Sequence, residues 1–185
     1  MKQFKLYGFL VVLSLLLAAC GSSTPTAKPT NTPANFDPNE FLTLVNQFRS
    51  QPQTCTENGV TTQLPAVPPV VLNDQLNASA KGHAQDMATK KYFSHDSQDG
   101  SSFYERNTAA GYGGQSIGEN IARGRETAQD TLDQWRNSQS GHCNLLMNAN
   151  TNEIGIGYGF RIENFGPDLD IVFSYWVFLA GRKNQ

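Results

Sequence analysis

The sequence is poor in the residues that most metal centres use, with three cysteines and three histidines among 185 residues. It contains no CxxC pair, which disfavours a zinc site built on cysteines. It also contains no HExxH motif, so a zinc peptidase of the common kind is not supported.

Basic residues are few as well, with 14 Lys and Arg against 16 Asp and Glu, for a formal net charge of −2. The sequence shows no basic patch, which disfavours a nucleic-acid partner and a polybasic membrane contact. The apolar run Ile171–Ala180 is far too short for a transmembrane helix. Residues 36–185 are enough chain for one domain with one sizeable core.

The N-terminus has the features of an export signal. Two lysines precede the apolar run Leu6–Leu17, which predicts a signal peptide over residues 1–19. Its end, Leu17-Ala18-Ala19-Cys20, resembles a bacterial lipobox, and the resemblance implies that Cys20 is lipidated and begins the mature chain. The alternative is an ordinary secretory signal cleaved after a small residue. Several acyl chains on Cys20 would anchor the protein stably to a membrane.

The segment that follows Cys20 is rich in Ser, Thr and Pro up to residue 35, with Pro25, Pro29 and Pro33 evenly spaced. Such a composition cannot bury a core, so we expect residues 20–35 to form a tether. In an extended polyproline form the tether would reach on the order of 45 Å. The folded domain is therefore predicted over residues 36–185.

Two cysteines, Cys55 and Cys143, fall inside this domain. In an exported protein such a pair predicts a disulfide bond. The alternatives are two buried thiols or, less favoured, a shared zinc site. A bridge over this separation would stabilise the fold by at most about 4–5 kcal/mol in the loop-entropy model. It would also fix His142 against the N-terminal part of the domain.

Periodicity and capping residues predict four helices. The first begins at Asp37-Pro38 and the second is capped by Asn73. The expected ranges are Pro38 to about Ser50, Asn73 to Lys90, Phe103–Ala110 and Glu126–Gln139. The Pro- and Thr-rich stretch Gln51–Val71 is predicted to be a long loop that carries Cys55.

Two strands are expected near the C-terminus. Residues Ile154–Phe160 alternate apolar side chains with glycine, and the glycine face would let another element approach closely. Residues Asp170–Leu179 are nearly all apolar, which is typical of a strand buried on both faces. Helices come first and strands late, which favours an α+β domain with helices packed on an antiparallel sheet.

Three polar residues have the surroundings of a functional site. His95, Glu119 and His142 each lie among Gly, Ser or Asn residues, which predicts loops or element ends. Our hypothesis is that these three side chains converge on one cleft. His83, in contrast, lies on the apolar stripe of its helix and is predicted to be a packed, hydrogen-bonded histidine.

Several segments, taken in order, resemble the CAP superfamily (cysteine-rich secretory proteins, antigen 5, pathogenesis-related 1), whose domain is also called SCP. The bacterial secreted branch is the best match, and a single Cys55–Cys143 bridge fits one of its subgroups. The resemblance implies an α-β-α sandwich with a large cleft. The segments are Leu72-Asn73-Asp74-Gln75-Leu76, Ala80, His83-Ala84-Gln85-Asp86-Met87-Ala88, Phe93-Ser94-His95, Gly118-Glu119-Asn120-Ile121-Ala122, Trp135 with Ser138, Gly141 and His142, and Ile154-Gly155-Ile156-Gly157.

In that family two histidines and two acids line the cleft, and in some members they bind zinc or another divalent ion. The resemblance implies that His95, His142 and Glu119 take these places here. Ser138 stands at about the place of the second acid, so the full tetrad is not present. Asn120, Trp135 and Ser138 are expected to support the cleft.

Two imidazoles and a carboxylate can bind Zn²⁺ and leave a fourth position for water. The same groups could act as an acid–base cluster without metal, or form a polar network that only holds loops. We favour a non-enzymatic module, tethered to a bacterial membrane outside the cytoplasm, that binds a lipid, another small apolar ligand or a cell-envelope component. Phe93, Tyr112, Trp135 and Tyr158 could wall its groove, although each would also serve the core.

The alternative function is a metal-dependent hydrolase of peptide or ester bonds, with His95, Glu119 and His142 as its catalytic residues. The sequence does not indicate the oligomeric state.

Overall fold

The computed structural model describes residues 35–167 and 169–183, so the predicted signal peptide, Cys20 and almost all of the tether lie outside the described residues. Within those ranges no helix is long and apolar enough to span a bilayer. The elements are α1 (Pro38–Arg49), β1 (Gln53–Glu57), β2 (Val60–Leu64), β3 (Val71–Leu72), α2 (Asp74–Lys90), α3 (Phe103–Ala109), β4 (Gln115–Arg123), α4 (Ala128–Arg136), α5 (His142–Leu146), β5 (Glu153–Asn164) and β6 (Asp170–Arg182).

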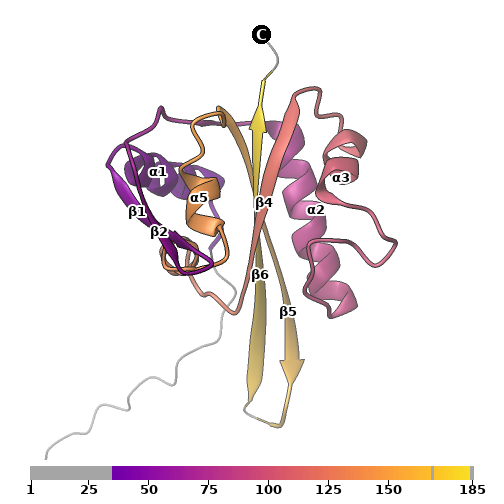
Figure 1. The fold of residues 1–185 in the computed structure, drawn as a ribbon. Helices are drawn as coiled ribbons and strands as arrows, with labels where there is room; N and C mark the ends of the chain where they lie inside the picture. Colours follow the sequence, from indigo (N-terminus) through magenta and orange to yellow (C-terminus); the bar gives the residue numbers. More distant parts are fainter. Residues whose placement is uncertain (1–34, 168, 184–185) are drawn as a thin grey trace, which may run out of the picture. The chain divides into compact units, whose positions relative to one another are not determined.

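A four-stranded sheet in the order β3-β5-β6-β4 forms the middle layer of the domain. Helices α2 and α3 lie on one side of it, and α1, α5 and the β1–β2 hairpin lie on the other (Figure 1). The β4–β6 and β5–β6 pairs are antiparallel, whereas the two-residue strand β3 pairs in parallel with β5. The α+β class and the α-β-α sandwich are therefore confirmed.

Strand β6 is the centre of the core, because its two faces supply two separate apolar clusters. Trp176, Phe178 and Ala180 join the cluster that contains α1, α4 and α5. Tyr175, Val177 and Leu179 join the cluster that contains α2. The prediction of a strand buried on both faces is confirmed.

Helix α2 packs on β5 at backbone contact, as the alternating glycines predicted. A Cβ atom on Gly157 would lie only 2.1 Å from the carbonyl carbon of Ala80. Equivalent atoms on Gly155 and Gly159 would also clash with the backbone of α2. Only glycine allows this approach, so the glycine face sets the distance between helix and sheet.

The helix starts follow the capping residues that the sequence predicted. Asp37 accepts a hydrogen bond from the backbone N–H of Asn39, and Pro38 takes the first helical position of α1. Asn73 accepts hydrogen bonds from Gln75 and Leu76 at the start of α2. Helix α4 is shorter than expected, since it is capped by Thr127 and ends at Arg136.

The prediction of a loop over Gln51–Val71 is wrong in part, because strands β1 and β2 form an antiparallel hairpin there. The turn is Asn58-Gly59, with φ values of +50° and +79°. Both turn residues have positive φ, which Asn and Gly tolerate and which suits the twist of paired strands. The Asn-Gly pair was therefore a hairpin signal.

The prediction that Glu119 lies in a turn or at an element end is also wrong. Glu119 is the fifth residue of the nine-residue strand β4, where it pairs with Leu179 of β6. Gly and Asn flank it and favour turns locally, but the register with the buried strand β6 overrides that preference.

Helix α1 is tied to distant loops by a buried arginine. The Arg49 guanidinium is 1% exposed and donates hydrogen bonds to four carbonyl oxygens. Burial lowers the pKa of Arg49 to about 10, so the group stays charged at neutral pH. Its acceptors are the backbone oxygens of Pro68, Leu146, Asn148 and Thr151.

We expect Gly157→Ala to destabilise the protein by about 3 kcal/mol, because the new methyl group would force α2 away from the sheet. Gly82→Ala is the matched control, because a Cβ atom at Gly82, on the exposed face of α2, meets nothing within 4 Å. That change should be neutral or stabilise by up to about 1 kcal/mol. Urea unfolding measures both, and equal effects of the two substitutions would contradict the account.

Candidate functional site

The Glu119 carboxylate is a buried charge that is held on both sides. Its side chain is 1% exposed. His95 Nδ1 lies 2.9 Å from Oε1, and Arg106 Nη2 donates to Oε2 at 2.7 Å. Since a buried carboxylate needs partners for its charge, these two contacts are what make Glu119 tolerable inside the sheet.

Arg106 reaches Glu119 from α3 and also holds the loop that carries His95. Its Nη1 donates to the backbone oxygen of Ser101 at 2.8 Å and to Ser97 Oγ at 3.2 Å. A capping box between Ser102 and Glu105 fixes the residue at which α3 begins, and with it the side of the helix on which Arg106 lies. The sequence analysis missed Arg106, although this capping signal predicts where the helix begins.

His83 holds the same loop from α2. Its ring is 1% exposed, and Nε2 donates to the backbone oxygen of Ser94 over 2.9 Å. The hydroxyls of Tyr92 and Ser97 lie 3.5 and 3.4 Å from Nδ1. Burial lowers the pKa of His83, which keeps the ring neutral at neutral pH. The expectation of a packed, hydrogen-bonded histidine is confirmed.

His142 enters the site from the other helical layer, as the first residue of α5. Its Nδ1 lies 2.7 Å from Ser138 Oγ, and its backbone oxygen accepts a hydrogen bond from Asn120 at 3.0 Å. Burial lowers the pKa of His142, and a protonated His95 would lower it further. His142 is therefore neutral at pH 7.

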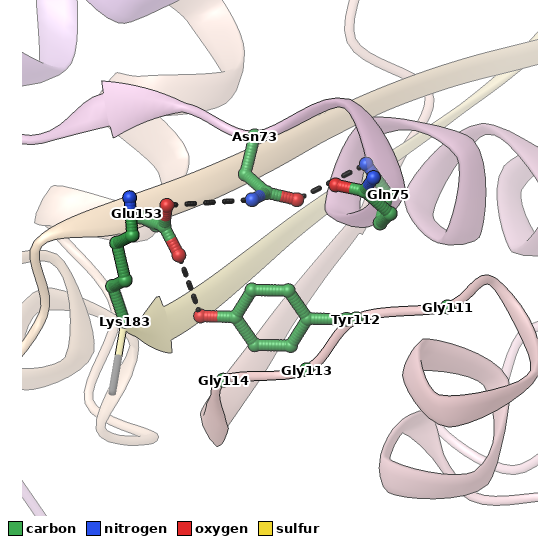
Figure 2. A pocket seen from close by; sticks show the side chains of 8 residues that line it. All are labelled: Asn73, Gln75, Gly111, Tyr112, Gly113, Gly114, Glu153 and Lys183. Atoms are coloured by element: carbon green, nitrogen blue, oxygen red, sulfur yellow. Dashed lines mark hydrogen bonds between the residues drawn. The ribbon is translucent and has the colours of Figure 1, made fainter. Parts of the chain in front are cut away.

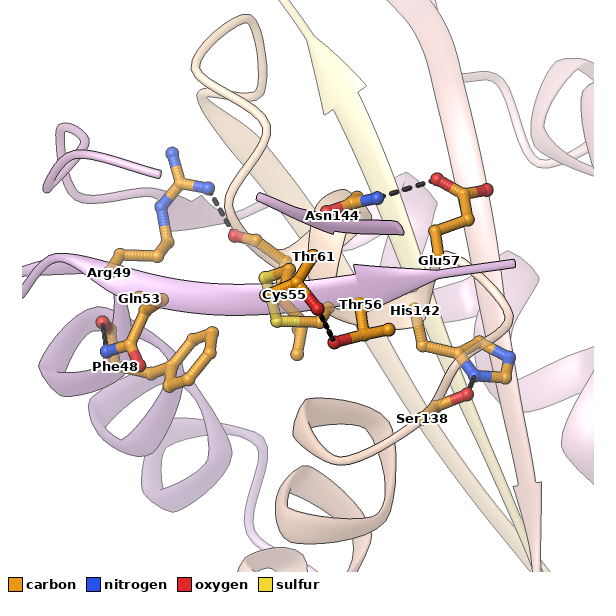
Figure 3. The surroundings of a disulfide bond; sticks show 12 residues. Phe48, Arg49, Gln53, Cys55, Thr56, Glu57, Thr61, Ser138, His142 and Asn144 are labelled. Atoms are coloured by element: carbon orange, nitrogen blue, oxygen red, sulfur yellow. Dashed lines mark hydrogen bonds between the residues drawn. A yellow bond between two sulfur atoms is a disulfide. The ribbon is translucent and has the colours of Figure 1, made fainter. Parts of the chain in front are cut away.

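The disulfide bond Cys55–Cys143 is present, which confirms the prediction, and it fixes the residue next to His142 (Figure 3). The two Cα atoms lie 5.5 Å apart across a sequence separation of 88 residues. Figure 3 also shows Asn144 bonded to Glu57 of β1, through Nδ2 and Oε2 at 2.6 Å. The β1–β2 hairpin thus serves as a brace for the start of α5.

Trp135 lies beneath the site and completes its support. The ring is fully buried, and its Nε1 donates to the backbone oxygen of Ile121 at 3.0 Å. This bond connects α4 to β4 two residues from Glu119. Trp135 thus contacts β4, and the other two expected supporting residues, Asn120 and Ser138, contact His142.

We use the name histidine site for His95, Glu119 and His142. Each imidazole has its Nδ1 engaged, and neither Nε2 makes a hydrogen bond to any residue described by the structure. Both oxygens of Glu119 already accept hydrogen bonds, one from His95 and one from Arg106. No group of three or more His, Cys, Asp and Glu side chains in the described ranges is placed to hold one metal ion. The two Nε2 atoms are thus the atoms of the site that could bind a metal ion.

Most of the aromatic residues expected to wall a groove are in the core. Trp135 is 0% exposed, and Tyr112 and Tyr158 are each 8% exposed. Phe93 differs, since it is 42% exposed and lies under the Arg123 guanidinium at 5.4 Å. Of the four residues, only Phe93 offers an exposed apolar surface.

Tyr112 instead borders a separate polar pocket of about 360 Å³ at the start of α2. Its hydroxyl donates to Glu153 Oε2 at 3.0 Å, and Asn73 Nδ2 lies 3.4 Å from the other oxygen (Figure 2). Burial and this carboxylate raise the pKa of Tyr112. The pocket contains no residue of the histidine site.

The segment Gly114-Gln115-Ser116-Ile117-Gly118 spells Gly-x-Ser-x-Gly. In hydrolases this pattern forms a sharp turn between a strand and a helix. Here Ser116 is the second residue of strand β4, and its Oγ accepts a hydrogen bond from Asn107 Nδ2 at 2.9 Å. The geometry of a nucleophile turn is therefore missing from this described segment.

Comparison with known proteins identifies the family. The CAP family, described as the cysteine-rich secretory protein family, matches residues 42–175, which is well over half of the chain. The protein therefore belongs to the CAP family.

Two proteins of Bacillus subtilis (strain 168) are similar in sequence. The uncharacterised protein YkwD is 36% identical over 90 residues, or 49% of this chain and 35% of YkwD. The uncharacterised membrane protein YlbC is 35% identical over 95 residues, or 50% of this chain and 27% of YlbC. The matched part thus spans about a third of YkwD and about a quarter of YlbC.

Two solved structures share the fold. One is an extracellular protein containing an SCP domain from Bacillus anthracis str. Ames, with a TM-score of 0.50 and 31% identity over 63% of this chain and 35% of that one. The other is an outer surface protein from Borrelia burgdorferi, with a TM-score of 0.52 and 16% identity over 80% of this chain and 97% of that one. The second likeness concerns the fold alone.

We expect Arg106→Gln to destabilise the protein by about 3–5 kcal/mol, because it leaves a buried carboxylate without its guanidinium partner. Arg136→Gln serves as the control, since Arg136 Nη1 lies 3.9 Å from Asp133 and both side chains are about half exposed. Loss of that surface pair should change stability by less than about 1 kcal/mol. Urea unfolding of both variants checks this, and a similar small loss in each would refute the buried ion pair as a support.

Proposed function

We propose that the protein is a non-enzymatic binding module, anchored outside the cytoplasm, whose two histidines bind a divalent cation such as Zn²⁺. The observation that carries this proposal is the pair of imidazoles whose Nδ1 atoms are engaged and whose Nε2 atoms bond to no described residue, supplied by two different layers of the fold. Neutral imidazole nitrogen is a preferred ligand of Zn²⁺.

In this arrangement Glu119 orients the metal-binding histidine and does not bind the cation itself. A carboxylate that accepts the Nδ1–H of a histidine fixes the ring and leaves Nε2 as the basic nitrogen, a common partner of metal-binding histidines. The 2.9 Å contact between Glu119 and His95 has this form. Direct coordination by Glu119, which the family resemblance implies, would require the carboxylate to release His95 or Arg106 and stays a prediction.

A cation held by two imidazoles would leave coordination positions open for water or for a donor atom of a ligand. Phe93, exposed and two residues before His95 in the chain, would give an apolar contact to such a ligand. We therefore propose a lipid, another small apolar molecule or a cell-envelope component with one metal-binding group as the ligand class.

Hydrolysis of peptide or ester bonds is the alternative that the same residues offer. Both Glu119 oxygens already accept hydrogen bonds, so the proton acceptor would have to be an imidazole Nε2 rather than this carboxylate. We place binding first, because the same Nε2 atoms are the nitrogens that would hold the cation.

The proposed location follows from the N-terminal sequence and is consistent with the relatives. The lipobox-like Cys20 would carry the anchor, and the tether would join the domain at Phe36. That ring lies 5.8 Å from the rings of Tyr158 and Trp176, so the domain begins at a packed residue. Proteins described as extracellular, outer-surface and membrane proteins are among those similar to this chain.

Calorimetric titration of the protein with Zn²⁺ tests the proposal. We expect one saturable site that is lost in His95→Ala and in His142→Ala, and that is about 10–100-fold weaker in Glu119→Gln. Asp96→Asn is the matched control, because Asp96 is an exposed acid beside His95 and outside the histidine site. Its affinity should equal that of the parent.

Circular dichroism first establishes that each variant is folded. Undiminished binding in both histidine variants, or no binding by the folded parent, would overturn the proposal.

A further inference from the structure

Exposed apolar side chains gather at the far end of the β5–β6 hairpin. In the described part of the chain eight large apolar residues are exposed, and four of them lie between residues 160 and 169. Figure 1 shows that this end of the hairpin extends beyond the helices that cover the sheet. The four residues are Phe160, Ile162, Phe165 and Leu169, each 46–57% exposed.

The outer edge of β5 is paired only at its beginning. Strand β3 reaches Ile154 and no further, and Asn77 Oδ1 accepts a hydrogen bond from the Ile156 N–H at 2.9 Å. Beyond these residues, no strand in the ranges 35–167 and 169–183 pairs with this edge.

The direction of each backbone group along β5 follows from these bonds. The Ile154 oxygen and the Ile156 N–H both point to the outer edge. Because backbone groups alternate along a strand, the N–H and C=O groups of Phe160 and Ile162 point to that edge as well. The residues with exposed apolar side chains thus also present open backbone donors and acceptors, which is a template for another strand.

We propose that a second copy of this chain pairs here, β5 against β5 in antiparallel orientation, about a two-fold axis at Ile162. In this register the two Ile162 residues face each other and exchange both backbone hydrogen bonds. Arg161 of each copy then lies opposite Glu163 of the other. A two-fold interface requires such a self-complementary surface.

The charges select this register over its neighbours. An axis at residue 161 would place Arg161 opposite its own copy, and an axis at residue 163 would do the same for Glu163. Like charges directly opposite each other are destabilising, whereas opposite charges stabilise a strand pair.

Both side chains are already held near the edge. Arg161 Nη1 and Glu163 Oε1 form an ion pair within the strand, the Arg161 guanidinium lies 3.9 Å from the Phe173 ring centre, and Glu163 Oε1 lies 2.8 Å from Lys91 Nζ. Pairing of two copies would add opposite charges to an ion pair that each copy already holds.

Other occupants fit this edge less well. Segment 21–35 of the chain carries Pro25, Pro29 and Pro33, and proline donates no backbone hydrogen bond to a strand. At this end of the hairpin Glu163 and Asp170 balance the charges of Arg161 and Lys91, so these groups give an anionic membrane surface no net positive charge to bind. A second copy supplies both the strand and the complementary charges.

Oxidative crosslinking of the full chain carrying Ile162→Cys, in membranes of cells that express it, tests the pairing. Directly opposite residues in a hydrogen-bonded pair have Cα atoms about 5.5 Å apart, which suits a disulfide. We expect a crosslinked product of twice the chain mass. Val60→Cys is the control, because Val60 is 67% exposed on strand β2, away from this edge.

A crosslink by Ile162→Cys no stronger than that of Val60→Cys, or a product with the mass of another partner, would overturn the proposal. The chain without an added cysteine shows how much crosslinked product its own cysteines form.

Charge reversal tests the register. In the Ile162→Cys background, Arg161→Glu alone and Glu163→Arg alone should each weaken crosslinking about tenfold, since each puts two pairs of like charges in contact. The combined exchange Arg161→Glu with Glu163→Arg restores opposite charges and should restore the crosslink. The register would be refuted if the single reversals did not weaken crosslinking. It would also be refuted if the combined exchange did not restore the crosslink.

Discussion

The backbone contact between α2 and the glycine face of β5 sets the position of nearly everything else in this protein. With Gly157 at contact distance from Ala80, α2 runs along β5, and Lys91 at the end of the helix pairs with Glu163 of that strand. The loop that leaves α2 brings His95 to Glu119 in the middle of β4. A larger residue in β5 would separate the layer that holds His95 from the sheet that holds its carboxylate partner.

The histidine site is built from parts that are positioned independently. One imidazole comes from the α2 side, where His83 and Arg106 hold its loop. The other comes from the opposite helical layer, where the disulfide next to His142 ties α5 to the β1–β2 hairpin. Glu119 balances the Arg106 charge and orients His95. This division explains how a buried carboxylate can be retained without leaving an unpaired charge, since every charge has a partner before any ligand arrives.

Much of this fold could be predicted from local signals. Asp37 and Asn73 marked helix starts because capping is a local hydrogen bond, and the glycine alternation in β5 marked a close packing face. Asn58-Gly59 also signalled a hairpin, and reading that segment as a loop gave too much weight to its prolines. Glu119 was misplaced for a different reason, since Gly-Glu-Asn favours a turn and only pairing with β6 makes it a strand. The contact of Arg106 with Glu119 depends on how α3 packs beside β4, which no local pattern reveals.

The central claim is that His95 and His142 present their Nε2 atoms to one ligand site while His83 only supports the loop. The chain has three histidines, so a long-range ¹H–¹⁵N NMR spectrum of the imidazoles can follow all of them during addition of Zn²⁺. The account predicts that the Nε2 signals of His95 and His142 shift together and that those of His83 stay unchanged, with Nδ1 of His95 still protonated. A spectrum in which only one of the two rings responds, or in which His83 shifts with them, would contradict it.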